Sequence, residues 1–123
     1  MSFFQRFFAA LDGPAPVSSL DFVADEMRYA IFWTQSAGRE SEQHVGGKED
    51  LRRFVEAGGV RTWTHHLTRT AVVDGVEMVV GETRDNESGE RAATFVAAAE
   101  LDQDGRMTRY MVARTPAIGF VEG

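Results

Sequence analysis

The sequence contains no cysteine, and this absence excludes several kinds of site. A chain without cysteine has no disulfide, no thiolate nucleophile and no cysteine-ligated zinc centre. Such a composition is typical of a reducing compartment, and we expect a cytoplasmic protein. No apolar run approaches the roughly 20 residues of a membrane-spanning helix. The opening residues, MSFFQRFF, also lack the basic start and the small-residue cleavage site of a signal peptide.

Basic residues are fewer than acidic ones. The chain has 13 Lys and Arg against 19 Asp and Glu, a net charge of -6 and a pI near 5.0. Its positive charges are scattered among acids and do not form the basic face that binding to phosphate backbones requires. We therefore expect neither a nucleic acid nor a membrane as a partner. The histidines show no HxH or HExxH spacing and the glycines no dinucleotide fingerprint, so no metal and no cofactor are expected.

The first part of the chain reads as helices. Apolar residues recur at helical spacing in FFQRFFAAL, which predicts an amphipathic helix that ends at Gly13-Pro14. Ser18 or Ser19 can cap a short helix that runs to Val23. The segment GGKEDLRRFVEAGG predicts a further helix, with an apolar face made by Leu51, Phe54 and Val55.

Strands account for most of the remainder. In MRYAIFW, Met27, Tyr29, Ile31 and Trp33 alternate with other residues, as on a strand with one apolar face. From Val60 to Thr115, four β-rich runs are separated by turn signals such as Asp74-Gly75 and Asp104-Gly105. The polar segment 34–45 is expected to be a surface loop and a candidate binding lid. At 123 residues, the chain is one domain, residues 1–123.

This order of elements predicts an α+β fold: a cone-shaped, curled antiparallel sheet with about three helices on its concave face. The blocks FFAALDG, LDFVADEMRYAI, GGKEDLRRFV, VVDGVEMVV and LDQDGRMTRYMVARTP span nearly the whole chain. In these blocks the sequence resembles the nuclear transport factor 2-like superfamily, also called cystatin-like or ketosteroid isomerase-like, and within it the SnoaL-like polyketide cyclase group. The resemblance implies an apolar pocket at the open end of the cone.

The catalytic positions that the resemblance implies are occupied by unsuitable residues. Those of the ketosteroid isomerases fall at Phe7, Ile31 and Ala97, none of which can accept or donate a proton. The acid or base of the SnoaL-type cyclases falls at Val112. The arginine and aspartate that epoxide hydrolase-like members place two residues apart are here adjacent, at Arg84 and Asp85.

Strand alternation suggests other candidates. If Val76, Met78 and Val80 face the pocket, Glu82 and Arg84 lie at its mouth. The last strand offers an inward face of Thr108, Tyr110, Val112 and Arg114. The candidate catalytic residues are Glu82, His66 and Tyr110. The candidate ligand-binding residues are Tyr29, Trp33, Trp63, Met78, Arg84, Val112 and Arg114.

Two alternatives stay open at this stage. Glu82, Tyr110 and the two arginines can equally be partners in ion pairs at the rim of the sheet. Of the adjacent His65 and His66, one must face inward, and the pattern does not decide which; a bulge in this long strand would explain the ambiguity.

Three functions fit these observations. The first is a pocket that binds a small apolar or aromatic ligand. The second is an acid/base enzyme of the isomerase, cyclase, dehydratase or epoxide hydrolase type with a non-standard catalytic set. The third is a protein-interaction domain whose cone is filled by bulky side chains. The outer sheet face, expected to carry Val79, Val96, Ala98, Met111 and Ala113, predicts a homodimer because such an apolar band is usually an interface.

Overall fold

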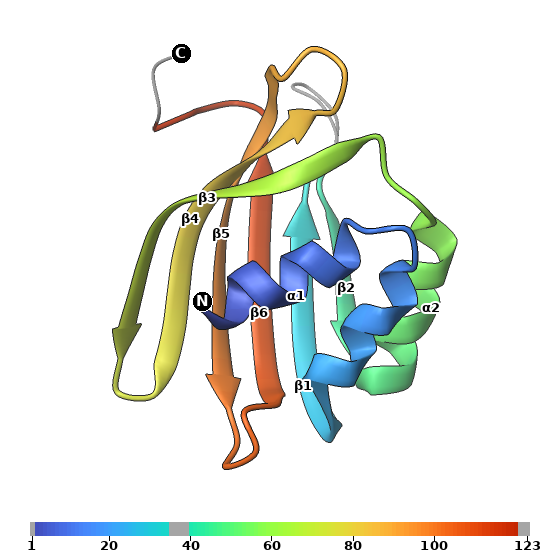
Figure 1. Cartoon of the computed structure of the whole chain (residues 1–123), viewed down its shortest axis with the longest axis vertical. Helices are drawn as coiled ribbons and strands as arrows, with labels where there is room; N and C mark the ends of the chain where they lie inside the picture. Colours follow the sequence, from blue (N-terminus) through green and yellow to red (C-terminus); the bar gives the residue numbers. More distant parts are fainter. Residues whose placement is uncertain (1, 35–39, 121–123) are drawn as a thin grey trace.

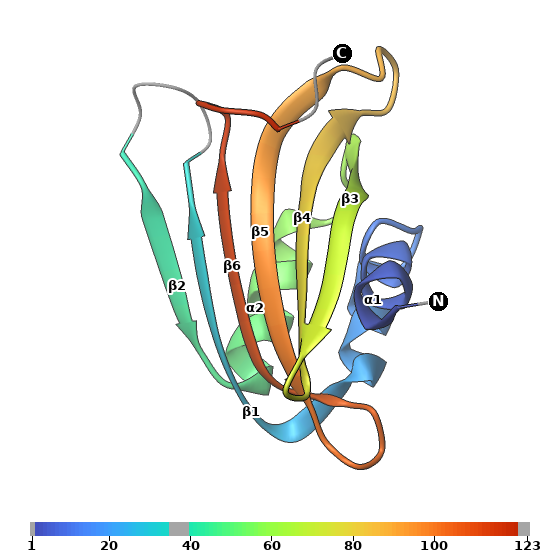
Figure 2. The same cartoon turned by 90° about the vertical axis from the view of Figure 1, so that its left-hand side faces the viewer.

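A computed structural model describes residues 2–34 and 40–120 of the chain (Figures 1 and 2). Helix α1 is followed by a 3₁₀ helix, η1, by two strands, by helix α2 and then by a four-stranded meander. The elements in chain order are α1 (Phe3–Leu11), η1 (Pro16–Phe22), β1 (Val23–Trp33), β2 (Glu42–Gly46), α2 (Lys48–Gly58), β3 (Trp63–Val73), β4 (Val76–Asp85), β5 (Arg91–Leu101) and β6 (Met107–Thr115).

The six strands form one curled sheet in the order β2-β1-β6-β5-β4-β3. All neighbouring pairs are antiparallel except β1 and β6, which run parallel with Tyr29 opposite Tyr110. The expected α+β cone is therefore present, but the sheet is mixed rather than wholly antiparallel. The reason is topological: the chain leaves β1 and β2 through α2, starts the meander at the far edge, and returns beside β1 in the direction that three hairpins impose.

Both α-helices lie on the same side of the sheet (Figure 2). Helix α1 packs on β3 and β4, α2 packs on β1 and β2, and η1 contacts both helices. The predicted apolar stripe of α1 is confirmed, because its phenylalanines and Leu11 are all buried. Ser2 caps this helix in a capping box with Gln5. No helix within the described ranges is long and apolar enough to cross a membrane.

The polar segment 34–45 is not simply a loop. Residues 35–39 lie outside the described part of the chain, so a lid there stays a prediction, but Glu42–Gly46 forms the edge strand β2. Its ladder with β1 runs from Tyr29 opposite Gly46 to Trp33 opposite Glu42. An edge strand needs only one partner and tolerates polar side chains, which is why its composition did not reveal it.

The prediction of which β4 side chains face the inside of the cone is wrong. Glu77, Val79 and Thr83 are buried on the concave side, whereas Met78 is 39% exposed on the convex side. Glu77 can face inward because its carboxylate accepts hydrogen bonds from the backbone N–H groups of Phe3 (3.1 Å) and Phe4 (2.8 Å). The free N–H groups at the start of a helix supply the hydrogen bonds that a buried carboxylate needs. Glu77 can therefore face the core, although alternation of apolar and polar residues predicts that a charged residue faces water.

The alternation predicted for β1 agrees with the structure, and that predicted for β6 agrees from Tyr110 onward. Thr108, expected to face inward, is half-exposed, because a register shift places the fully buried Met107 in the core instead. Met27, Tyr29 and Ile31 of β1 are buried, as is Tyr110 of β6. The suspected bulge in β3 is present as a register shift between Leu67 and Arg69.

Glu77 supplies a test of how α1 is held. Glu77→Ala removes the acceptor of two buried N–H groups, and each unsatisfied group costs roughly 1–3 kcal/mol. We expect the free energy of unfolding in urea to fall by about 2 kcal/mol or more. Glu100→Ala, at an exposed position of the neighbouring strand β5, is the matched control and should change it little. Equal stability of the two variants would show that α1 is not anchored at this end.

Candidate functional site

A cavity of about 620 Å³ opens between α2 and the adjoining ends of β1, β2, β3 and β6. A narrower space of about 60 Å³ extends from this region into the cone. The outer cavity is lined by Trp33, Glu42, His44, Phe54, Ala57, Gly58, Val60, Arg61, Thr62, Trp63 and Arg114. The inner one adds Phe7, Leu11, Ile31, Leu51, Val55, His65, Phe95, Tyr110 and Val112. The outer volume is in the range that holds a small organic molecule.

Aromatic rings make the wall on the α2 side. The ring of Phe54 lies 6.0 Å from Trp33 and 4.8 Å from His44, measured between centroids. Trp33 is oriented by a hydrogen bond of 2.7 Å from its Nε1 to Glu42 Oε2 on β2. Such a wall presents flat apolar faces to a planar ligand.

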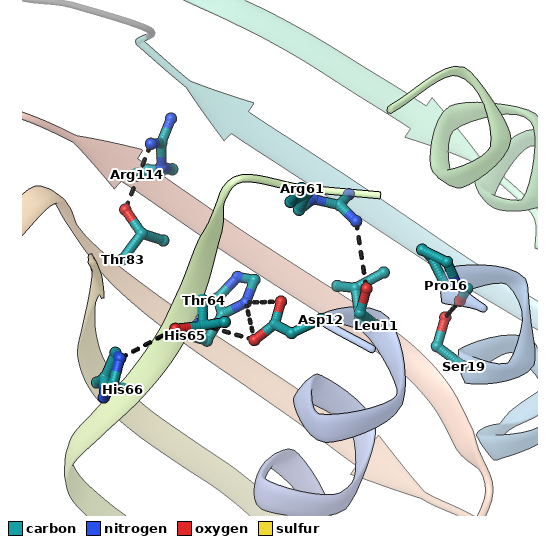
Figure 3. Close-up of polar contacts among 10 residues, drawn as sticks. All are labelled: Leu11, Asp12, Pro16, Ser19, Arg61, Thr64, His65, His66, Thr83 and Arg114. Carbon is teal, nitrogen blue, oxygen red and sulfur yellow. Dashed lines mark hydrogen bonds and ion pairs between the residues drawn. The ribbon is translucent and has the colours of Figure 1, made fainter. Parts of the chain in front are cut away.

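Asp12 and His65 form a dyad beside the inner cavity (Figure 3). Asp12 ends helix α1, and its carboxylate lies 2.8 and 3.1 Å from His65 Nδ1 while accepting the backbone N–H of His65 at 2.8 Å. Both side chains are only 9% exposed. The imidazole also stacks on Phe8, with the two centroids 4.0 Å apart. The position of the dyad is therefore fixed by the end of α1, by strand β3 and by the ring of Phe8.

The dyad prepares His65 to accept a proton. A carboxylate can only accept, so the Nδ1 of a neutral His65 carries the hydrogen and Nε2 keeps its lone pair. Burial lowers the pKa of His65 below its ordinary 6.5, the bond to Asp12 acts in the opposite direction, and the charges of Arg61 and Arg114 lower it further. A neutral imidazole oriented by a carboxylate is a common general base.

Phe95 packs against the same imidazole and against Phe8. Its ring meets that of His65 edge to face at 5.1 Å. This position is available because residue 81 on the adjacent strand is glycine: a Cβ there would lie 2.6 Å from the Phe95 ring and 2.5 Å from the carbonyl oxygen of His66. Gly81 thus creates the space for the floor of the cavity.

Tyr110 is a further polar group of the inner cavity. Its ring packs against Phe4 and Phe7, and burial raises the pKa of its hydroxyl well above 10.0. It therefore stays protonated and can serve as a hydrogen-bond donor. Among the residues described, no three His, Asp or Glu side chains are grouped so as to hold a metal ion.

The predicted catalytic set is divided by the sheet. Tyr110 is on the concave side, but Glu82 and His66 are cross-strand neighbours on the convex side. Glu82, 8% exposed, accepts a hydrogen bond of 2.7 Å from Arg84 Nε. His66 bonds instead to Thr64 at 3.0 Å. The alternative of an ion pair describes Glu82 and Arg84 correctly. Glu82 was placed at the pocket because the inward and outward faces of β4 were exchanged in the prediction.

The ligand-binding set is brought together in part. Trp33, Val112 and Arg114 line the cavity, as predicted from alternation on β1 and β6. Trp63 also lines it, although alternation on β3 did not decide which way its side chains face. Tyr29 is buried further along the concave face and does not line it. Met78 and Arg84 are on the convex side because β4 has the opposite phase.

Sequence reasoning missed Asp12, Phe54 and Arg61 as cavity groups and left His65 undecided. Asp12 looked like the polar residue that ends a helix, and Phe54 like ordinary core. Arg61 follows two glycines in a turn with no periodic pattern. No local signal brings these positions together, since Asp12 and His65 are 53 residues apart.

No family model matches the sequence, and no curated protein matches it. Solved structures do match. A proposed isomerase of the SnoaL-like family from Agrobacterium tumefaciens superimposes with a TM-score of 0.67 at 13% identity, covering 90% of this chain and 92% of that one. A proposed ketosteroid isomerase from Kribbella flavida gives 0.63 at 20% identity, covering 98% and 80%. A cystatin-like protein of unknown function from Nostoc punctiforme gives 0.66 at 16% identity, covering 96% and 90%.

These likenesses confirm the expected fold, which is the curled α+β cone of the SnoaL-like, nuclear transport factor 2-like and cystatin-like proteins. At such identities the similarity concerns the fold, and the chemistry must be argued from the cavity.

The protonation of His65 can be measured directly. By nitrogen-edited NMR we expect His65 to titrate below 6.5, and to titrate still lower in Asp12→Asn, because the carboxylate raises its pKa. Because the pKa of His65 is lower in the folded state, the unfolded chain binds this proton at a higher pH than the folded chain does. The contribution of His65 to the free energy of unfolding is therefore fully present above about pH 6.5. It declines by up to about 1.4 kcal/mol per pH unit as the pH falls toward the folded-state pKa. Asp21→Asn, at an exposed acid, is the control. A His65 pKa above 6.5, or one that rises in Asp12→Asn, would contradict the dyad.

Proposed function

We propose that the protein binds a small apolar or aromatic molecule in the cavity at the open end of the cone. The observation that carries this proposal is the cavity of about 620 Å³, walled by Trp33, Phe54 and Trp63 and continuous with a narrow inner space. Ligand sites are typically concave, mostly apolar and furnished with a few converging polar groups. Here those groups are an arginine pair, the Asp12–His65 dyad and Tyr110.

The outer cavity, about 620 Å³, leaves room for a ligand at the mouth of the cone, whereas the space inside the cone is only about 60 Å³. Of the three bulky residues that could have filled it, Phe95 lies at its floor, Trp33 stands at the wall of its mouth and Met78 is on the convex side. The outer cavity, rather than the nearly filled interior, is therefore what favours ligand binding over a domain that serves protein interactions alone.

The Asp12–His65 dyad favours a second candidate, an acid/base enzyme. A base needs a lone pair within reach of the substrate and a pKa that leaves it unprotonated at working pH. His65 lines the inner cavity, and burial keeps it neutral. Tyr110 supplies a nearby hydrogen-bond donor of the kind that stabilises a developing oxyanion. The titration of His65 tests this candidate, because an imidazole already protonated at neutral pH could not act as the base.

We further propose that two copies of the chain pair through the convex face. Exposed and half-exposed apolar side chains cover adjacent strands there: Met78, Val80, Val96, Ala98, Met111 and Ala113. Val79, expected in this set, is 2% exposed and faces inward, and Met78 and Val80 take its place. We refer to these six residues as the convex patch. A contiguous surface of this kind is usually an interface, and two-fold pairing is the commonest way to bury it.

Ligand binding can be followed by intrinsic fluorescence, because the chain has two tryptophans and both line the cavity. A screen of planar aromatic fragments should yield ligands that shift the emission of Trp33 and Trp63 and raise the melting temperature. In Trp33→Phe and Trp63→Phe, the single remaining indole should report the same ligands. If many fragments raise the melting temperature without changing either emission, they bind elsewhere and the proposed site is wrong.

Pairing through the convex patch can be tested by light scattering. Ala98→Arg and Met111→Arg place a charge in the patch and should convert a dimer into a folded monomer; Met111 is 62% exposed, so its replacement should not disturb the core. Val72→Arg, 66% exposed near the β3–β4 hairpin, is the control and should remain dimeric. A monomeric wild type, or arginine variants that stay dimeric, would refute this proposal.

A further inference from the structure

Two arginines converge on the cavity from different parts of the fold. Arg61 comes from the turn between α2 and β3, and Arg114 from strand β6 (Figure 3). Both line the outer and the inner cavity. Their guanidinium carbons lie 5.3 and 4.9 Å from the ring centroid of Trp63, and Arg114 also lies 5.6 Å from that of Trp33.

Neither guanidinium forms an ion pair within residues 2–34 and 40–120, although the carboxylate of Asp12 is close enough to Arg61 to raise the pKa of its guanidinium. Arg61 donates only a long hydrogen bond of 3.5 Å to the carbonyl of Leu11, and Arg114 one of 3.3 Å to the hydroxyl of Thr83. The Nε of Arg114 is buried and has no partner among the described groups. The two carboxylates of the region, Asp12 and Glu42, keep their negative charge but hydrogen-bond to His65 and Trp33 rather than to either arginine.

This arrangement is costly without a ligand. Burial disfavours both charged guanidinium groups and lowers their pKa values, and the charge of Arg61 lowers that of Arg114 further. The indole faces offset part of the cost through cation–π attraction. An unpaired buried donor still loses the hydrogen bonds that it would make with water. An anion between the two side chains would supply both the countercharge and the missing acceptor.

The surroundings indicate the kind of anion. Guanidinium groups bind carboxylates and phosphates through paired N–H donors. The two donors are set among aromatic walls rather than among backbone N–H groups, and two guanidiniums suit a singly charged acid attached to a flat apolar body. We propose, on the basis of the ligand-binding function above, that the cavity selects small planar carboxylic acids, with the carboxylate held by Arg61 and Arg114 and the ring against the indoles of Trp33 and Trp63.

The proposal places the acid group close to the dyad. His65 lines the inner cavity together with both arginines, and a ring fixed by its carboxylate would lie against the outer aromatic wall, because the inner space of about 60 Å³ is too small to hold it.

The test compares matched ligands by calorimetry and by tryptophan emission. The ligands are benzoate, phenylacetate and naphthoate, the amide of each acid, and phenyl phosphate. Each ligand is measured with the wild-type protein and with the variants Arg61→Gln, Arg114→Gln and Arg109→Gln. Arg109 is on the same strand as Arg114 but is exposed on the convex side, which makes it the matched control. Hydrogen bonds to a charged group contribute roughly 1.5–3 kcal/mol, so at least one acid should bind about tenfold or more tightly than its amide.

This preference should shrink to about threefold or less in Arg61→Gln and Arg114→Gln and persist in Arg109→Gln. Arginine-selective NMR adds a readout that does not depend on either variant folding, because the Nε–H resonance of Arg114 should shift when the acid binds and not when the amide binds.

The outcomes separate this inference from the function on which it rests. If acids and amides bind equally well and both alter tryptophan emission, the cavity binds ligands but does not select acids, and only the inference falls. Tighter binding of phenyl phosphate than of every acid overturns the carboxylate assignment. If no probe binds and no fragment of the wider screen alters tryptophan emission, both proposals fail.

Discussion

Helix α1 is anchored to the sheet by a buried carboxylate at each of its ends. Glu77 of β4 accepts the first free N–H groups of the helix, and Asp12, at its last turn, reaches the backbone and the ring of His65 on β3. Each contact joins residues more than fifty positions apart. Together they fix the position of α1 across the sheet, so the phenylalanine stripe becomes the floor of the cone and Phe8 lies flat on His65. The cavity exists because α1 is held there and α2 covers the other half of the sheet.

The polar groups of the cavity are each positioned by a structural contact. Asp12 ends a helix and orients His65; Glu42 belongs to an edge strand and orients Trp33; Gly81 makes room for Phe95 against the imidazole. Arg61 and Arg114 differ in this respect, because their described contacts are long, neutral or, for Arg114 Nε, missing. Polar side chains with complete hydrogen bonds, such as Asp12 and Glu42, hold the fold together. Polar side chains with incomplete hydrogen bonds, such as Arg61 and Arg114, indicate where a ligand could bind.

Related folds do not supply the chemistry of this chain. The positions that the resemblance to the ketosteroid isomerases marks as catalytic hold Phe7, Ile31 and Ala97, and all three are buried apolar residues here. The cyclase position is Val112, a wall of the inner cavity. The Asp12–His65 dyad comes from elsewhere, from the end of α1 and the start of β3. A shared cone can therefore carry different side chains at different points of its wall.

The sequence by itself determined the elements whose two faces differ strongly in polarity. The stripe of α1, the inward residues of β1 and β6, and the helix containing Leu51 all follow from local periodicity, because one side meets water and the other does not. Three of the predicted cavity residues, Trp33, Val112 and Arg114, follow from that alternation. The tertiary structure decided the rest. On β4 both faces carry apolar side chains, so periodicity could not set the phase, and the inward Glu77 is stable only because a helix start lies over it. The choice between His65 and His66 depended on a bulge and on Asp12, and Arg61 gained a role only when its turn was placed beside β6. A local pattern reports whether a residue faces water; which distant residue it faces is set by packing of the whole chain.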